Sequence, residues 1–101
     1  MAVSCVSADR TLTATLSGEL DHHGAKQIMG ELDRRIEREM PRKLTIDMKD
    51  VTFTDSSGIA VLLRAHRLMD QLEGGLTVIN VPQQAQRVFR AAGLGRMIRF
   101  L

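Results

Sequence analysis

This sequence is poor in aromatic residues and in cysteine. Tryptophan and tyrosine are absent from its 101 residues and phenylalanine occurs three times, so the core must be built from Leu, Ile, Val and Met. The single cysteine, Cys5, excludes an intramolecular disulfide and fits a reducing compartment. Because Cys5 lies in an apolar run, we expect it to be a small buried hydrophobe rather than a reactive thiol.

The sequence also lacks blocks of like charge and long apolar runs. Its 14 basic and 12 acidic residues are mixed along most of the chain. Arg87, Arg90, Arg96 and Arg99 give the C-terminal third a basic bias, but the aromatic interleaving of a nucleic-acid patch is missing, so the charge pattern does not favour nucleic-acid binding. The longest apolar run is about five residues, whereas a membrane-spanning helix needs roughly 20. No signal-peptide pattern precedes the first predicted strand. The length fits one domain, residues 1–101, which we expect to be cytoplasmic, with neither nucleic acid nor membrane as a partner.

The beginning of the chain predicts a β-hairpin. Residues 3–6 are apolar, residues 11–16 alternate between apolar and polar, and residues 8–10 form a tight turn between them. Residues 17–23 break the alternation. Within them, Asp21 is suited to cap a helix, because its carboxylate can accept hydrogen bonds from free backbone N–H groups.

Helices and strands are then expected to alternate. A helix over residues 22–40 ends at Pro41. A strand over residues 44–48 continues, after a polar kink, through residues 51–53, and a second helix covers residues 59–72. The first of these helices carries apolar residues at helical spacing that predict its buried stripe: Ala25, Ile28, Met29, Leu32 and Ile36.

The C-terminal part continues this alternation. Residues 76–81 are almost continuously apolar, which predicts a strand covered on both faces. A third helix begins at Pro82 and ends at Gly93, and its apolar stripe is Ala85, Val88, Phe89 and Ala92. Residues 96–101 predict a short final strand.

The predicted order of elements is β-β-α-β-α-β-α-β. Strands that alternate with helices imply parallel pairs joined by crossover helices, and the initial hairpin adds an antiparallel pair. We therefore expect an α/β fold with a mixed four- to five-stranded sheet and helices packed on it.

Residues 54–59, Thr-Asp-Ser-Ser-Gly-Ile, lie between a predicted strand and a predicted helix. They make a good helix start, in which Asp55 or Ser56 is the cap and Gly58 lets the turn pack closely. A serine there also faces solvent, and a phosphate on it changes the local charge by about −1.5 to −2. The helix N-terminus can accept that anion without unfolding. The segment is thus either an ordinary helix start or a phosphorylation site at Ser56.

Three segments carry a resemblance to a known family. They are Gly-Glu-Leu-Asp-His-His at residues 18–23, the stretch around Asp-Ser-Ser-Gly at residues 51–62, and the C-terminal Arg87-Val88-Phe89 with Gly93-Leu94 and Met97-Ile98-Arg99-Phe100. In these segments and in their spacing, nearly the whole chain resembles the STAS-domain anti-sigma-factor antagonists. Asp-Ser-Ser-Gly is typical of the wider family, whereas Gly-Glu-Leu-Asp-His-His points to its sporulation branch.

The resemblance implies a binding protein rather than an enzyme. In that family the phosphoacceptor is the serine directly after the aspartate, which is Ser56 here. The unphosphorylated protein binds an anti-sigma factor, itself a serine kinase, and thereby frees the sigma factor. The kinase then uses ATP to phosphorylate the antagonist, which dissociates, and a PP2C-type phosphatase restores it. The resemblance implies no cofactor and a monomer when free. It also indicates a partner-binding surface made of Asp21, His22, His23, Asp55, Ser56, Ser57, Gly58 and Ile59.

Two features leave alternatives open. His22 and His23 are either part of the partner-facing surface or two exposed imidazoles at a helix start. They do not support a hydrolase, since no Gly-x-Ser-x-Gly pattern surrounds Ser56, or a metal site, since no carboxylate or cysteine cluster completes one.

The sequence also leaves open which signalling pathway the protein serves. A STAS domain that acts in a general-stress or another signalling pathway, with a different kinase as its partner, would have much the same sequence features. Relatives often have a further helix after the last strand, which this sequence does not contain.

Overall fold

The computed structural model describes residues 2–101 and contains five strands and three α-helices in the predicted order. Within these residues no helix combines the length and the apolar character needed to span a bilayer. The elements are β1 (Ala2–Ala8), β2 (Thr11–Leu20), α1 (His22–Glu39), β3 (Lys43–Thr54), α2 (Ser56–Gln71), β4 (Gly75–Ile79), α3 (Gln83–Ala91), the 3-10 turn η1 (Leu94–Arg96) and β5 (Arg99–Phe100).

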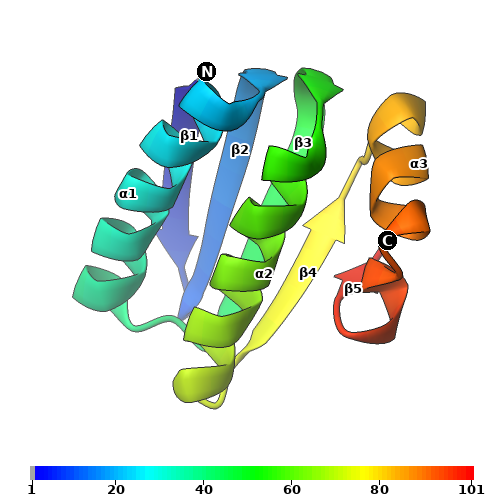
Figure 1. Cartoon of the computed structure of the whole chain (residues 1–101). Coiled ribbons are helices and arrows are strands. Elements are labelled where there is room, and N and C mark those ends of the chain that lie inside the picture. Colours follow the sequence, from blue (N-terminus) through cyan, green and yellow to red (C-terminus); the bar gives the residue numbers. More distant parts are fainter. Residues whose placement is uncertain (1) are drawn as a thin grey trace.

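The five strands form one sheet in the order β1-β2-β3-β4-β5. The β1–β2 pair is antiparallel, as the hairpin prediction required, and the three other pairs are parallel. Because each crossover moves the chain in the same direction along the sheet, right-handed connections send the helices to the same face. Figure 1 shows α1 and α2 side by side over that face, with α3 beside the β4 and β5 end.

The core lies between the sheet and the helices. Leu12, Ala14 and Leu16 of β2 are fully buried there, and so are Leu44, Ile46 and Met48 of β3. The predicted stripe of α1 is confirmed, although Met29 is only half-buried. Phe89 is the one buried aromatic side chain among the described residues, so the core is aliphatic as expected.

Two strands differ from the prediction in length. β2 continues to Leu20, and the break in its alternation corresponds to two register shifts against β3, at Thr15/Ser17 and Gly18/Glu19. β3 likewise runs unbroken through the polar residues 49–50. A bulge changes which side chains face the core without ending the strand, so the periodicity alone suggested an interruption.

The expectation that β4 is covered on both faces was wrong. Leu76 and Val78 are buried, whereas Thr77 and Ile79 are only partly covered. The reason is the one-directional strand order, which leaves the face opposite the helices open. The final strand is also shorter than predicted: η1 occupies its first part and only Arg99–Phe100 pairs with β4.

Candidate phosphorylation and partner-binding site

The site is built where two parallel strands end. The register pairs Leu20 with Thr54, so β2 and β3 finish at the same level of the sheet. Asp55 N–H also reaches the carbonyl of Leu20, at 3.4 Å. Since α1 follows β2 directly and α2 follows β3, the two helices begin side by side at this edge (Figure 1). Carboxyl ends of strands in open α/β sheets are the usual place for binding sites.

Both helices begin with an aspartate cap. Asp55 has extended backbone angles, and its Oδ1 accepts a hydrogen bond from Ser57 N–H at 2.7 Å. Asp21 caps α1 in the same way by accepting from Gly24 N–H at 2.8 Å. The sequence left Asp55 and Ser56 as alternatives for the cap, and the structure assigns that role to Asp55. Helix α2 therefore begins at Ser56, three residues before the predicted start.

Ser56 is the first residue of α2 and is exposed to solvent. Its hydroxyl is not needed for the cap, because the Asp55 carboxylate already occupies the Ser57 N–H. The exposure expected of a residue that a kinase must reach is thus present. The Asp55 carboxylate is directed to the backbone, so it is not in the position of a triad aspartate oriented toward a histidine.

Thr54 anchors the site to the rest of the fold. It is fully buried, and its hydroxyl donates to the carbonyl of Leu20 at 3.3 Å. Its backbone is held by Gln84 of α3 through two hydrogen bonds. Thr54 N–H donates to Gln84 Oε1 at 3.0 Å, and Gln84 Nε2 donates to the Thr54 carbonyl at 2.8 Å. This pair of bonds, the Gln84 clamp, fixes the end of β3 two residues before Ser56.

Gly58 lets the start of α2 pack closely against the ends of β2 and β3. A Cβ placed on it would overlap Thr54 Oγ1 and would lie 3.1 Å from Leu20 Cδ2. The close packing predicted at this position is therefore confirmed, and only glycine fits it without a shift. Because Gly58 is buried, it shapes the turn and offers no side chain to a partner. Gly58 remains a predicted partner-binding residue, and the structure adds that it shapes the turn at the start of α2.

The other predicted residues differ in exposure. His22 and His23 are exposed at the start of α1, whereas Asp21, Ser57 and Ile59 are partly buried. In residues 2–101 no group of three His, Cys, Asp or Glu side chains is arranged to hold a metal ion. The exposed part of the predicted surface is thus centred on Ser56 and the two histidines.

Comparison with known proteins identifies the family. A STAS domain model matches residues 3–101. The chain belongs to the STAS family. The anti-sigma F factor antagonist of Paenibacillus polymyxa is 32% identical over 87 residues, which are 86% of this chain and 74% of that protein. That of Lysinibacillus sphaericus is 29% identical over 84% of this chain and 73% of its own.

Solved STAS structures agree with this assignment. The anti-sigma factor antagonist SpoIIAA in its unphosphorylated form is 27% identical and superposes with a TM-score of 0.85, over 99% of this chain and 88% of its own. The phosphorylated form of SpoIIAA from Bacillus, also 27% identical, gives a TM-score of 0.76 over 99% of this chain and 91% of its own. These comparisons confirm the family and the fold that the resemblance implied.

Two residues of this STAS site were not singled out from the sequence. Gln84 lies in the first turn of a helix, where a polar side chain is ordinary, so its contact with a strand 30 residues away leaves no local signal. Phe53 was placed in a strand, but its side chain is 43% exposed three residues before Ser56. An exposed aromatic side chain is the more informative of the two, because such residues often anchor interfaces.

Proposed function

We propose that this STAS protein is an anti-sigma-factor antagonist whose unphosphorylated form binds an anti-sigma factor and frees the sigma factor. The partner is itself a serine kinase, and its phosphorylation of Ser56 ends binding. The observation that carries the proposal is the placement of Ser56: an exposed hydroxyl at the first position of α2, on a chain similar to anti-sigma F factor antagonists. That SpoIIAA has been solved with and without phosphate supports the role of phosphorylation.

Phosphorylation of Ser56 changes the surface and leaves the scaffold intact. Ser56 makes no capping bond that a phosphate would break, because Asp55 is the cap. The phosphate points into water and adds about −1.5 to −2 charges beside the Asp55 carboxylate. The dipole of α2 partly compensates for this charge at the helix N-terminus. The fold therefore tolerates the group, whereas a partner surface shaped for a neutral hydroxyl does not.

The energy available is enough for a switch. Desolvating a dianion in an interface without a matching cation costs several kcal/mol. A loss of about 4 kcal/mol corresponds to roughly 10³-fold in affinity. No large conformational change is needed for an effect of this size.

We define the switch surface as His22, His23 and Ser56, which are exposed at the starts of α1 and α2, together with Phe53, which is exposed near the end of β3. Phe53 supplies the apolar contact, and the histidines and Ser56 supply the polar rim. Asp21, Asp55, Ser57, Gly58 and Ile59 complete the partner-binding set around it. In this proposal a PP2C-type phosphatase regenerates the binding form, and the protein acts in the cytoplasm, as a monomer when free and without enzymatic activity of its own.

The proposal is tested with the cognate kinase, ATP and mass spectrometry. Wild type is expected to gain one phosphate, on Ser56, and to lose affinity for the kinase by roughly 10³-fold. Ser56→Ala is expected to bind and to remain bound when ATP is added, and Ser56→Asp to bind weakly. Ser4→Ala is the matched control, because Ser4 is an exposed serine of β1 outside the partner-binding set, and it should behave like wild type. Phosphate on another residue, or release of Ser56→Ala by ATP, would show that Ser56 is not the switch.

A further inference from the structure

The C-terminal part of the chain has an unbalanced charge. No aspartate or glutamate follows Glu73, while four arginines do: Arg87, Arg90, Arg96 and Arg99. All four are exposed. The ion pairs found within residues 2–101 involve Arg35, Lys49 and Arg64 and none of these four. The net charge of +2 is therefore the sum of +4 after Glu73 and −2 in the rest of the chain.

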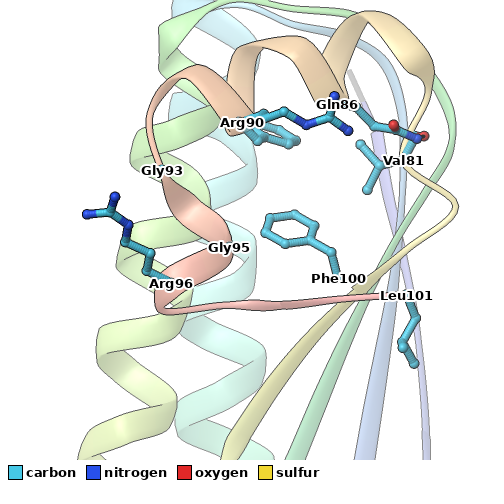
Figure 2. Close-up of a pocket in the computed structure, with 9 residues that line it drawn as sticks. Val81, Gln86, Arg90, Gly93, Gly95, Arg96, Phe100 and Leu101 are labelled. Carbon is cyan, nitrogen blue, oxygen red and sulfur yellow. Dashed lines mark hydrogen bonds between the residues drawn. The ribbon is translucent and has the colours of Figure 1, made fainter.

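Two of these arginines border a cleft between α3 and the end of the chain. The cleft has a volume of about 540 Å³, and Val81 and Phe100 contribute its apolar lining. Figure 2 shows the Arg90 side chain extending toward Gln86 on the same helix, with the ring of Phe100 below it, and Arg96 extending outward from the turn that follows α3. Phe100 stacks on the buried Phe89, with ring centroids 6.0 Å apart, so the apolar lining is held in place.

The surroundings of the cleft have the composition of a protein interface. Arginine, methionine and aromatic residues are enriched in interfaces, while lysine, glutamate and aspartate are depleted. Residues 81–101 contain no Lys, Glu or Asp. Leu101, which lines the cleft, is 71% exposed, and Met97, which follows the lining residue Arg96 in the sequence, is 50% exposed.

The shape of the cleft favours a macromolecular partner over a small ligand. Of the residues that line it, Phe89 alone is buried, and Arg90, Arg96 and Leu101 are exposed. Pockets for small molecules bury most of the ligand, which this open cleft does not.

We propose that this cleft docks an acidic peptide segment of a partner protein. An apolar side chain of that segment enters between Val81 and Phe100. Carboxylates on either side of it pair with Arg90 and Arg96, whose guanidinium groups can bind carboxylates with two parallel hydrogen bonds. The cleft shares no residue with the switch surface, so this interaction is separate from the phosphorylation of Ser56 and does not depend on the function proposed above.

The test uses fluorescently labelled helical peptides and the ¹⁵N-labelled full chain. One set of peptides carries Leu, Phe or Met on one face with glutamates beside it, and a matched set has lysine in place of each glutamate. We expect an acidic peptide to bind and to shift the amide signals of Val81, Gly95 and Phe100. The double variant Arg90→Glu/Arg96→Glu should lose at least about tenfold in affinity. Arg38→Glu makes the same kind of charge change on α1 and should bind like wild type.

Several results would overturn the proposal. One is the absence of binding by every acidic peptide at about 1 mM, the range of the weakest specific complexes. Another is equal binding of the lysine peptides. A concentration-dependent dimer that the double variant abolishes would identify a second copy of this chain as the occupant. Tighter binding of a DNA oligonucleotide than of any peptide would identify a nucleic-acid surface instead.

Discussion

Replacing Gln84 by alanine removes both hydrogen bonds that hold the end of β3 against the start of α3. The lost partners are the backbone N–H and carbonyl of Thr54, a residue with no exposed surface. Each hydrogen bond contributes about 1 kcal/mol net. We therefore expect Gln84→Ala to lower the free energy of unfolding by about 2 kcal/mol. With a urea dependence of about 2 kcal/mol per molar, the midpoint falls by about 1 M.

The variant Gln84→Glu keeps one of the two hydrogen bonds and loses the other. A carboxylate can accept from the Thr54 N–H but cannot donate to its carbonyl, so this variant should be less stable than Gln84→Ala at pH 7. Only the protonated acid can donate to the Thr54 carbonyl, so protonation at low pH restores the second hydrogen bond. The difference in unfolding free energy between wild type and Gln84→Glu should therefore decrease as the pH is lowered.

The control residue is Gln83, which precedes Gln84 in the sequence. Gln83 is exposed, and Gln83→Ala makes the same chemical change in the same helical turn. It should change stability by less than about 0.5 kcal/mol. If Gln83→Ala and Gln84→Ala unfold at the same urea concentration, the Gln84 clamp does not stabilise the fold, and the reasoning above is refuted.

Four further predictions concern other parts of the fold. Gly58→Ala should lower stability by about 2 kcal/mol, because its Cβ overlaps Thr54 Oγ1. Gly30→Ala should raise stability by up to about 1 kcal/mol in the same urea assay, because its Cβ meets only ordinary contacts and alanine favours a helix. Asp55→Ala should cost about 1 kcal/mol through the lost cap, and Asp55→Asn should restore most of it. Burial raises the pKa of the Cys5 thiol, partly opposed by Arg35, so iodoacetamide should alkylate it more slowly at pH 8 than an unfolded cysteine.

Each of these predictions has its own contradicting result. If Gly58→Ala and Gly30→Ala change the urea midpoint equally, the close packing at Gly58 does not determine the stability of the fold. An unchanged urea midpoint for Asp55→Ala would mean that another group satisfies the Ser57 N–H. Cys5 alkylated at the rate of the urea-unfolded chain would show that its partial burial does not protect the thiol.

The helix caps show how well local information predicted this fold. Asp21 and Asp55 mark helix starts because their side chains accept hydrogen bonds from backbone N–H groups two or three residues away. Such short-range chemistry is visible in the sequence. The apolar periodicity of α1 and the family segment around Ser56 are local in the same sense. They led to the element order, the family and the candidate phosphorylation site.

The misjudged features involve contacts between distant residues. The open face of β4 depends on the sheet order, and the continuity of β2 depends on bulges in its pairing with β3. The Gln84 clamp joins residues 30 positions apart. No local pattern marks these features, because each depends on where another element lies.

By itself, the sequence determined which segments form helices and strands, which side chains are apolar enough to make the core, and that a serine follows an aspartate at the start of a helix. These properties depend on backbone hydrogen bonding and on side-chain spacing within one or two turns. Only the tertiary structure decided that the starts of α1 and α2 lie together, that Phe53 is exposed near the end of β3, and that two of the C-terminal arginines border a cleft. Those outcomes depend on how the strands pair and on which face the crossovers place the helices.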